Sequence, residues 1–273
     1  MPSFFELQAR PEWAAVDFIS DIHLWARSPA TIEAWANYMR TTSASAVLIL
    51  GDLFEVWVGD DSRSEPFEAA CLQVLAEAAA QRWVGVMHGN RDFLLGRDAL
   101  DPAGVYLLPD PSVLLAFGRR VLLTHGDELC LADLAYQRYR ATVRSPAVQA
   151  QFLSQPLAAR QAFVRQIRDQ SDERKAANPD FNDWADVDGP ALSEWMSGAR
   201  AADTVHGHTH RPGDQSIAPG RTRHVLTDWV LDEAEGHGPV RSGVLRLTAD
   251  GFFRIGLADA ARIGVEAGQA ALP

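Results

Sequence analysis

The stretch VDFISDIH (residues 16–23) decides the fold class of this chain. Its apolar, β-prone first half predicts a buried strand over Val16–Ile19, and a polar Asp-x-His sequence follows at once. Similar runs predict further buried strands over Val47–Leu50, Val84–Met87, Val121–Leu123 and Thr204–Val205. The segments between the first three strands have the composition of crossover helices, over Pro29–Tyr38 and Glu68–Ala80. This alternation predicts an α/β fold whose central strands are parallel.

The last third of the chain has a different pattern. Strand-like runs follow one another without a long helix between them, at Val225–Thr227, Val244–Leu247 and Phe252–Ile255. Ala249-Asp250-Gly251 is typical of a hairpin turn, so we expect an antiparallel portion, in one mixed sheet or in two facing sheets. The segment from about 134 to 195 is helical in composition, and we expect it to form a cap inserted into a single domain over residues 1–273.

The composition excludes several classes of protein. With 273 residues, 47% of them hydrophobic, the chain can bury a sizeable core, yet no apolar run reaches the roughly 20 residues of a membrane-spanning helix. A net charge of −11 argues against a general nucleic-acid binder. Because Glu6 and Arg10 interrupt the N-terminal segment, we expect no signal peptide and a cytoplasmic protein, with Cys71 and Cys130 as reduced thiols.

Polar residues that can bind a metal follow each predicted strand directly. The carboxyl ends of parallel strands meet at one edge of a sheet, so these residues should converge. Taken alone, each segment is ambiguous, because Asp-x-His or Gly-Asp is usually a turn and a lone buried histidine is usually a hydrogen-bonded core residue. Their repetition after every strand favours one shared site. The segments are SDIH (20–23), GD (51–52), GNRD (89–92), HGD (125–127) and HGHTH (206–210).

The residue types in these segments indicate a catalytic metal centre. Carboxylate, imidazole and amide groups without a thiolate suit Mn²⁺, Fe²⁺ or Zn²⁺ and disfavour a structural zinc site. Two ions roughly 3.5–4 Å apart would need a bridging carboxylate, for which Asp52 is the natural candidate. Water between such ions is acidic enough to attack phosphorus in line as hydroxide.

The five segments together resemble the signature of the calcineurin-like metallophosphoesterases. Longer strings are similar to the UDP-2,3-diacylglucosamine hydrolase family of the lipid A pathway: FISDIHL (18–24), LGDLFEVWVGDD (50–61), HGNRDFLLG (88–96), GRRVLLTHGDELC (118–130) and HGHTHRP (206–212). The resemblance implies an α/β fold with a two-sheet β-sandwich core, flanking helices and a helical cap. It also implies that two divalent ions, usually Mn²⁺, assist cleavage of the pyrophosphate of UDP-2,3-diacylglucosamine into UMP and 2,3-diacylglucosamine 1-phosphate.

The same resemblance assigns roles to individual residues. One ion would be bound by Asp21, His23, Asp52 and His210, and the other by Asp52, Asn90, His125 and His208. Asp52, Asn90 and Arg91 would be catalytic. Arg91 replaces a histidine of the wider superfamily, and we expect it to grip the attacked phosphate, since a sugar-phosphate leaving group hardly needs a general acid. The implied substrate contacts are Asn90, Arg91, Asp133, Ser171, Lys175, Asn178 and His208.

The cap departs from the family in places and combines basic and apolar residues. The family pattern has asparagine four residues and lysine seven residues after the serine, but this chain has Lys175 and Asn178 at those positions. Whether the two residues exchange roles stays open. Residues 134–180 contain eight basic and four acidic side chains, which suits an anionic substrate or a solvated helix pair. Seven apolar residues could line an acyl groove, contact the inner-membrane surface or form the cap's own core, which we favour for at least half: Leu134, Phe152, Leu153, Leu157, Phe163, Val164 and Ile167.

Two other functions fit part of the pattern. The chain could be another metallophosphoesterase, such as a cyclic nucleotide phosphodiesterase or a phosphomonoesterase, although Arg91 and the long cap both argue against it. It could also be a catalytically inactive binding module. An inactive copy should have lost metal ligands, and none of the seven expected ones is missing. We therefore expect an enzyme at the cytoplasmic side of the inner membrane, with a lipid-linked nucleotide sugar as its partner and no nucleic acid.

Overall fold

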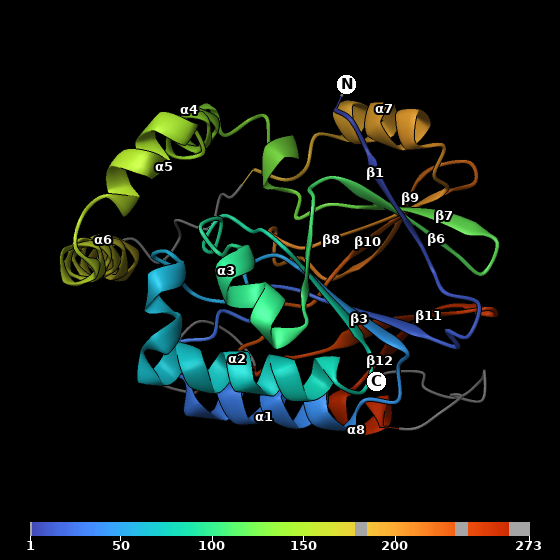
Figure 1. Ribbon diagram of the computed structural model, residues 1–273. Helices are drawn as coiled ribbons and strands as arrows, with labels where there is room; N and C mark the ends of the chain where they lie inside the picture. The colour runs from blue at the N-terminus through green and yellow to red at the C-terminus, as the bar shows by residue number, and fades with distance from the viewer. Residues whose placement is uncertain (1, 178–184, 233–239, 262–273) are drawn as a thin grey trace.

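The computed structural model describes residues 2–177, 185–232 and 240–261, apart from the side chains of 168–177. In it, two six-stranded sheets face each other (Figure 1). One sheet has the order β12 (Gly251–Ile255), β11 (Val244–Thr248), β2 (Val16–Ile19), β3 (Ala46–Leu50), β4 (Trp83–Met87) and β5 (Tyr106–Leu108). The other has the order β1 (Phe5–Gln8), β6 (Ser112–Ala116), β7 (Arg119–Leu123), β8 (Asp203–His206), β10 (Arg221–Val225) and β9 (Gly213–Ala218).

Both sheets are mixed, with parallel strands at their centres. β2, β3, β4 and β5 are parallel, as are β7, β8 and β10, whereas β11 and β12 are antiparallel. The five buried strands predicted from apolar runs are all present. Thr248 pairs with Gly251, so the turn is Ala249–Asp250 and Gly251 already begins β12. The strand expected at 225–227 lies earlier, because β10 ends at Val225.

Alternating side chains in the strands divide the core into layers. In β3, Leu48 points between the two sheets, whereas Val47 and Ile49 pack against helices on the outer face. Those helices are α1 (Pro29–Thr41) and α2 (Pro66–Ala79), which lie side by side below their sheet in Figure 1. Leu122 of β7 likewise points outward, onto α7 (Gly189–Ala199). The predicted two-sheet sandwich with flanking helices is therefore confirmed.

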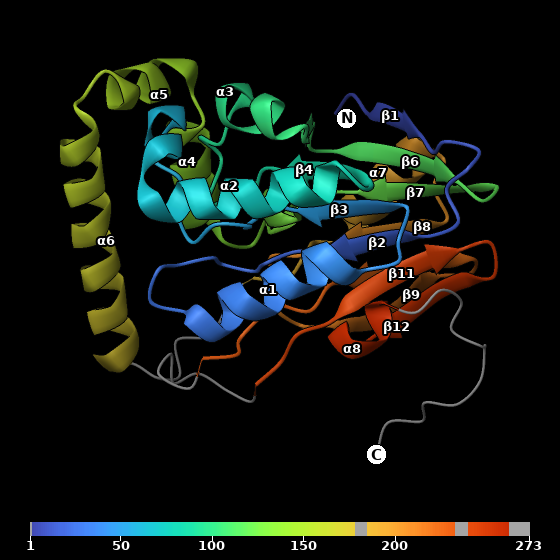
Figure 2. The same ribbon diagram turned by 60° about the horizontal axis from the view of Figure 1, so that its bottom comes forward.

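The inserted segment contains helices of two kinds. α4 (Leu134–Val143), α5 (Pro146–Leu153) and α6 (Leu157–Ala177) lie to one side of the sandwich in both views (Figure 1, Figure 2). α7, which the predicted insertion also includes, belongs to the sandwich instead, since Leu192 and Met196 are buried against the β6–β7 sheet. The division into one domain with a cap over 134–195 stays a prediction.

The cap exposes apolar side chains rather than burying them. Leu134, Leu153, Phe163 and Ile167 are 42% to 64% exposed. The other three apolar residues of the predicted set, Phe152, Leu157 and Val164, are half-buried. The expectation that at least half of the seven form an internal core is therefore wrong. Three helices that lie beside the sandwich do not enclose these side chains. Within the described ranges, no helix has the length and apolar character required to cross a bilayer.

Candidate metal centre and active site

The backbone is left-handed at five of the predicted ligands. Asp21, His23, Asp52, His208 and His210 have φ between 51° and 65°, and only two other non-glycine residues of the described chain have positive φ. Such conformations cost on the order of 1–3 kcal/mol each and need support from their surroundings. The loops after β2 and β3 support each other, since the N–H of Asp21 donates to Gly51 O at 3.1 Å and that of His23 donates to Asp52 O at 3.0 Å.

One group of donors combines Asp21, His23 and His210. His210 Nε2 lies 3.3 Å from Asp21 Oδ1, and His23 Nε2 lies 3.5 Å from His210 Nε2. Their possible ligand atoms all lie within 4.8 Å of one another. Two imidazole nitrogens and a carboxylate oxygen that point into one small volume form a donor set suited to a divalent transition metal.

A second group surrounds the side chain of Asn90. Asn90 Oδ1 lies 3.0 Å from both His125 Nε2 and His208 Nδ1. His125 Nε2 also lies 3.7 Å from Asp52 Oδ1. Amide, imidazole and carboxylate atoms therefore meet here as well.

Asp52 lies between the two groups. Its Oδ2 is 3.9 Å from His23 Nε2, whereas its Oδ1 is 3.7 Å from His125 Nε2. The N–H of Arg91 donates to Oδ1 at 2.8 Å. Each oxygen of one carboxylate thus faces a different group, an arrangement that suits a bridging ligand. The structure brings all seven predicted ligands together, and their role as ligands stays a prediction.

Burial and neighbouring charges shift the pKa values of the imidazoles in opposite directions. Burial alone would lower the pKa of His23, but the interaction with Glu55 and the negative charges of Asp52 and Asp21 together outweigh it and raise the pKa to about 9. At His125, the negative charges of Asp52, Asp21 and Asp127 together outweigh burial in the same way, and the pKa is also about 9. Burial and the charge of His125 lower the pKa of His208 to about 3. Without a metal, positive charge therefore resides on His23 and His125, where a cation would replace their protons.

The pKa values of the two central carboxylates, Asp52 and Asp21, also shift in opposite directions. Burial raises the pKa of Asp52 above its usual range. Burial acts in the same direction on Asp21, but the hydrogen bond and charge of His210, together with the charges of His125 and His23, outweigh it and hold the pKa of Asp21 well below its usual range. Two divalent ions would supply positive charge beside both carboxylates.

The start of the cap is joined to this site through Asp127. Its Oδ2 accepts hydrogen bonds from Tyr136 Oη at 2.6 Å and from Arg140 Nε at 2.8 Å. The ring of Tyr136 lies 5.8 Å from that of His208, centroid to centroid. Arg144 Nη2 donates to Gly89 O at 2.9 Å, beside Asn90. One face of α4 is therefore fixed over the site.

The predicted substrate contacts fall into two sets. Arg91 lies at the site with about a quarter of its side chain exposed, at 26%. Asp133 is the N-cap of α4, where its carboxylate accepts the N–H of Tyr136 at 2.9 Å. Ser171 and Lys175 lie on the backbone of α6, but their side chains, like the whole of Asn178, lie outside the described residues.

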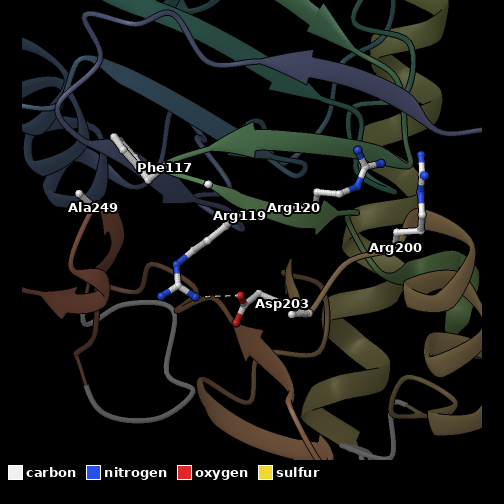
Figure 3. Close-up of a pocket in the computed structure, with 8 residues that line it drawn as sticks. Phe117, Arg119, Arg120, Arg200, Asp203 and Ala249 are labelled. Atoms are coloured by element: carbon white, nitrogen blue, oxygen red, sulfur yellow. Dashed lines mark hydrogen bonds and ion pairs between the residues drawn. The ribbon is translucent and has the colours of Figure 1, made fainter.

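A separate cavity lies at the opposite end of the sheets. It has a volume of about 580 Å³ and includes Arg119 and Asp203, which begin β7 and β8. The predicted ligands follow the other ends of these strands. Figure 3 shows Arg119 extending toward Asp203, with which it forms an ion pair at 3.5 Å. This cavity is therefore not part of the candidate site.

Comparison with known families agrees with this geometry. Residues 14–212 match the model of the calcineurin-like phosphoesterases. The chain belongs to this family. The resemblance predicted from the motifs is confirmed, and with it the prediction of a metal-dependent hydrolase.

Individual relatives of this phosphoesterase are closely similar. It is 42% identical to the UDP-2,3-diacylglucosamine hydrolase of Stenotrophomonas maltophilia (strain R551-3) over 248 residues, which cover 86% of this chain and 95% of the relative. It is 43% identical over 245 residues to the UDP-2,3-diacylglucosamine hydrolase of Xanthomonas oryzae pv. oryzae (strain PXO99A), with 86% and 95% covered. Among solved structures, Vps29 of Cryptosporidium parvum matches with a TM-score of 0.45 and 12% identity, over 86% of each chain.

Sequence reasoning missed two carboxylates of this phosphoesterase that contact predicted ligands. Glu55 Oε2 lies 2.9 Å from His23 Nδ1, and Asp228 Oδ2 lies 3.3 Å from His210 Nδ1. Glu55 is part of the string LGDLFEVWVGDD, so the motif contained it without indicating its contact. Asp228 follows a predicted strand directly, as the ligands do, and that position was its only signal.

Asp92 has a role that its position did not indicate. It follows a predicted strand within the GNRD segment, yet its carboxylate binds backbone. Oδ1 accepts the N–H of Gly89 and Oδ2 that of Leu53, each at 2.8 Å. Asp92 therefore joins the loops after β3 and β4, which carry Asp52 and Asn90.

Proposed function

We propose that this phosphoesterase hydrolyses the pyrophosphate of UDP-2,3-diacylglucosamine, with UMP and 2,3-diacylglucosamine 1-phosphate as products, in lipid A biosynthesis. The observation that carries the proposal is the convergence of seven donor side chains in two groups that share Asp52, with Arg91 beside them. The names of curated relatives, 42% to 43% identical over 86% of this chain, supply the substrate.

The donor set suits two divalent ions, for which we propose Mn²⁺. Asp21, His23, Asp52 and His210 would hold one ion, and Asp52, Asn90, His125 and His208 the other. Nitrogen and carboxylate or amide oxygen donors without a thiolate are the combination that Mn²⁺ accepts in catalytic sites. When bound, two such ions supply a nucleophilic water and positive charge for the phosphoryl oxygens.

The chain's own residues position the substrate. Arg91 is placed to bind phosphoryl oxygens, because its guanidinium is partly exposed and its backbone is fixed to Asp52. When the pyrophosphate is cleaved, the sugar phosphate leaves as a stable anion that hardly needs a proton donor. An arginine can therefore replace the histidine that the wider superfamily has at this position. This substitution favours a pyrophosphate over an alkyl phosphomonoester.

The exposed apolar residues of the cap suit the lipid part of the substrate. Leu153 and Phe163 are 42% and 52% exposed, and α4–α6 also carry the basic side chains of the insertion. Apolar residues flanked by basic ones are typical of a surface that contacts acyl chains or an anionic bilayer. We therefore place the enzyme at the cytoplasmic face of the inner membrane, with Asp133, Ser171, Lys175 and Asn178 as further substrate contacts.

A substrate panel tests the reaction. Metal-stripped protein is reconstituted with Mn²⁺ and offered UDP-2,3-diacylglucosamine, UDP-glucose and p-nitrophenyl phosphate, and the released nucleotide is identified by mass spectrometry. UMP should be released from the diacylated substrate at a far higher kcat/KM than from UDP-glucose. A preference for the monoester or for UDP-glucose would overturn the proposal.

Liposome flotation tests the membrane contact. The double variant Leu153→Ser/Phe163→Ser should bind anionic liposomes more weakly than the wild type does. Tyr106→Ser is the matched control, because Tyr106 is 59% exposed on β5 and not on the cap. Equal flotation of all three proteins would remove the membrane part of the proposal.

A further inference from the structure

Glu55 is a buried carboxylate whose two oxygens face two different functional side chains. Oε2 lies 2.9 Å from His23 Nδ1, and Oε1 lies 3.9 Å from Arg91 Nη1. The residue as a whole is only 8% exposed. His23 is a predicted metal ligand and Arg91 is the predicted phosphate-binding residue, so one carboxylate contacts both parts of the proposed machinery.

The backbone holds Glu55 firmly in this position. Its N–H donates to Leu24 O at 3.1 Å, and the N–H of Leu24 donates to Leu53 O at 2.8 Å. The preceding residue, Phe54, is fully buried and its ring packs 4.7 Å from that of Trp57, centroid to centroid. The backbone that carries the carboxylate is therefore held in place, and burial of the residue restricts the side chain, as a residue that orients others requires.

The contact with His23 determines which imidazole nitrogen can bind a metal. The negative charge of Glu55, 2.9 Å away, favours a proton on Nδ1, which leaves the lone pair on Nε2. Nε2 is the atom that lies 3.5 Å from His210 Nε2 and 3.9 Å from Asp52 Oδ2. The tautomer favoured by Glu55 is thus the one whose free nitrogen points at the candidate metal position.

The contact with Arg91 acts on the other side of the site. At 3.9 Å, the negative charge of Glu55 attracts the guanidinium without occupying it in a close hydrogen bond. An arginine restrained in this manner loses less side-chain freedom when it binds a phosphoryl group. Its orientation toward substrate then depends on the carboxylate that also orients His23.

We propose that Glu55 is a positioning residue that fixes His23 as an Nε2 metal ligand and orients Arg91 toward the phosphoryl group. The first part concerns metal binding alone. The second part rests on the function proposed above, because it requires a phosphorylated substrate.

Metal titration of Glu55→Gln tests the first part. Metal-stripped protein is titrated with Mn²⁺, and the free ion is followed by electron paramagnetic resonance. One of the two binding steps should weaken by about 10- to 100-fold, as is usual when a residue that orients a metal ligand is changed, and the other should stay unchanged. Glu12→Gln, an exposed and isosteric control, should bind as the wild type does. Wild-type binding by Glu55→Gln would overturn this part.

A double-mutant cycle with Arg91→Ala tests the second part. If Glu55 orients Arg91, the increase in KM caused by Glu55→Gln should be much smaller in the Arg91→Ala background. Arg91→Ala alone should leave the Mn²⁺ titration unchanged. Strictly additive changes in KM would overturn the role toward Arg91.

Two further measurements separate this proposal from a failure to fold and from a wrong function. Metal-free Glu55→Gln should melt close to the wild type, and Glu55→Asp, which keeps the charge but withdraws it by one methylene, should show the same weakened binding step. Wild-type Mn²⁺ binding by a folded Glu55→Asp would contradict the proposal that the length of the Glu55 side chain places its carboxylate beside His23. If the wild type released no UMP, the proposed function would fall, and the Mn²⁺ titration would still decide the role toward His23.

Discussion

The backbone N–H of His208 donates to Asp21 Oδ2 at 3.0 Å, across 187 residues of sequence. Asp21 follows β2 in one sheet and His208 follows β8 in the other. This hydrogen bond therefore joins the edges of the two sheets at the candidate site. A donor set drawn from both sheets depends on the sandwich staying closed, which links the stability of the fold to metal binding.

Gly207 permits this close approach, so Gly207→Ala should damage the site. A Cβ at Gly207 would lie 2.2 Å from Asp21 Oδ2 and 2.4 Å from Ser20 Oγ, far inside van der Waals contact. Displacement of Asp21 by about 1 Å is expected to cost about 10²-fold in kcat, together with Mn²⁺ affinity. Gly189→Ala is the matched control, since a Cβ there meets nothing within 4 Å. Wild-type metal affinity in Gly207→Ala would show that the contact is not needed.

Asp52→Ala should abolish turnover and lower the metal content. Its two oxygens face His23 and His125 separately, so loss of the side chain should affect both ions. We expect kcat to fall by at least ~10³, in the range that electrostatic groups at active sites contribute. Elemental analysis should find fewer than two ions bound to each folded chain. A variant that retained a tenth of the wild-type rate would contradict a bridging role.

The sequence was sufficient to predict the five segments that contain the seven donors because each segment follows an apolar run, and the family resemblance then selected the donors within them. Strand ends are the positions that topology brings together, so a local pattern was enough for residues such as Asp21 and Asn90. Glu55 has no such position, and Asp228 follows a predicted strand without any sign of its contact. Their roles depend on which imidazole nitrogen lies beside them, and that follows from loop geometry after folding.

Two of the strands that sequence reasoning missed, β1 and β9, lack the signal on which it relied, whereas the missed strand β6 carries a buried apolar run. β1 and β9 are edge strands whose side chains are mostly exposed, so no continuous apolar run marks them. The prediction for the cap was wrong for the opposite reason. Its apolar residues suggested a core, but whether Leu134 or Ile167 is buried depends on a packing partner that the described structure does not provide.

Arg246→Met should destabilise the fold strongly. Arg246 Nε and Nη2 donate to the two oxygens of Asp17 at 2.7 Å and 2.9 Å, and both side chains are buried. Removal of the guanidinium leaves the Asp17 charge buried without its partner, which typically costs about 3–5 kcal/mol of unfolding free energy. Arg40→Met removes an exposed pair with Glu77 and should cost less than about 1 kcal/mol in urea unfolding. Equal losses in the two variants would contradict this assignment.

Mn²⁺ binding should release protons and weaken as the pH falls. In the metal-free protein, the pKa values of His23 and His125 are raised to about 9, so both imidazoles are protonated at pH 7.5. A metal can bind each Nε2 only after its proton has left, so affinity should rise with pH up to about 9. His208, with a pKa of about 3, is already neutral and should release none. Calorimetric titrations at pH 7.5 in two buffers with different ionisation enthalpies should give different heats, corresponding to about one proton from each of the two protonated imidazoles. Heats that did not depend on the buffer would show that these imidazoles are neutral before the metal binds.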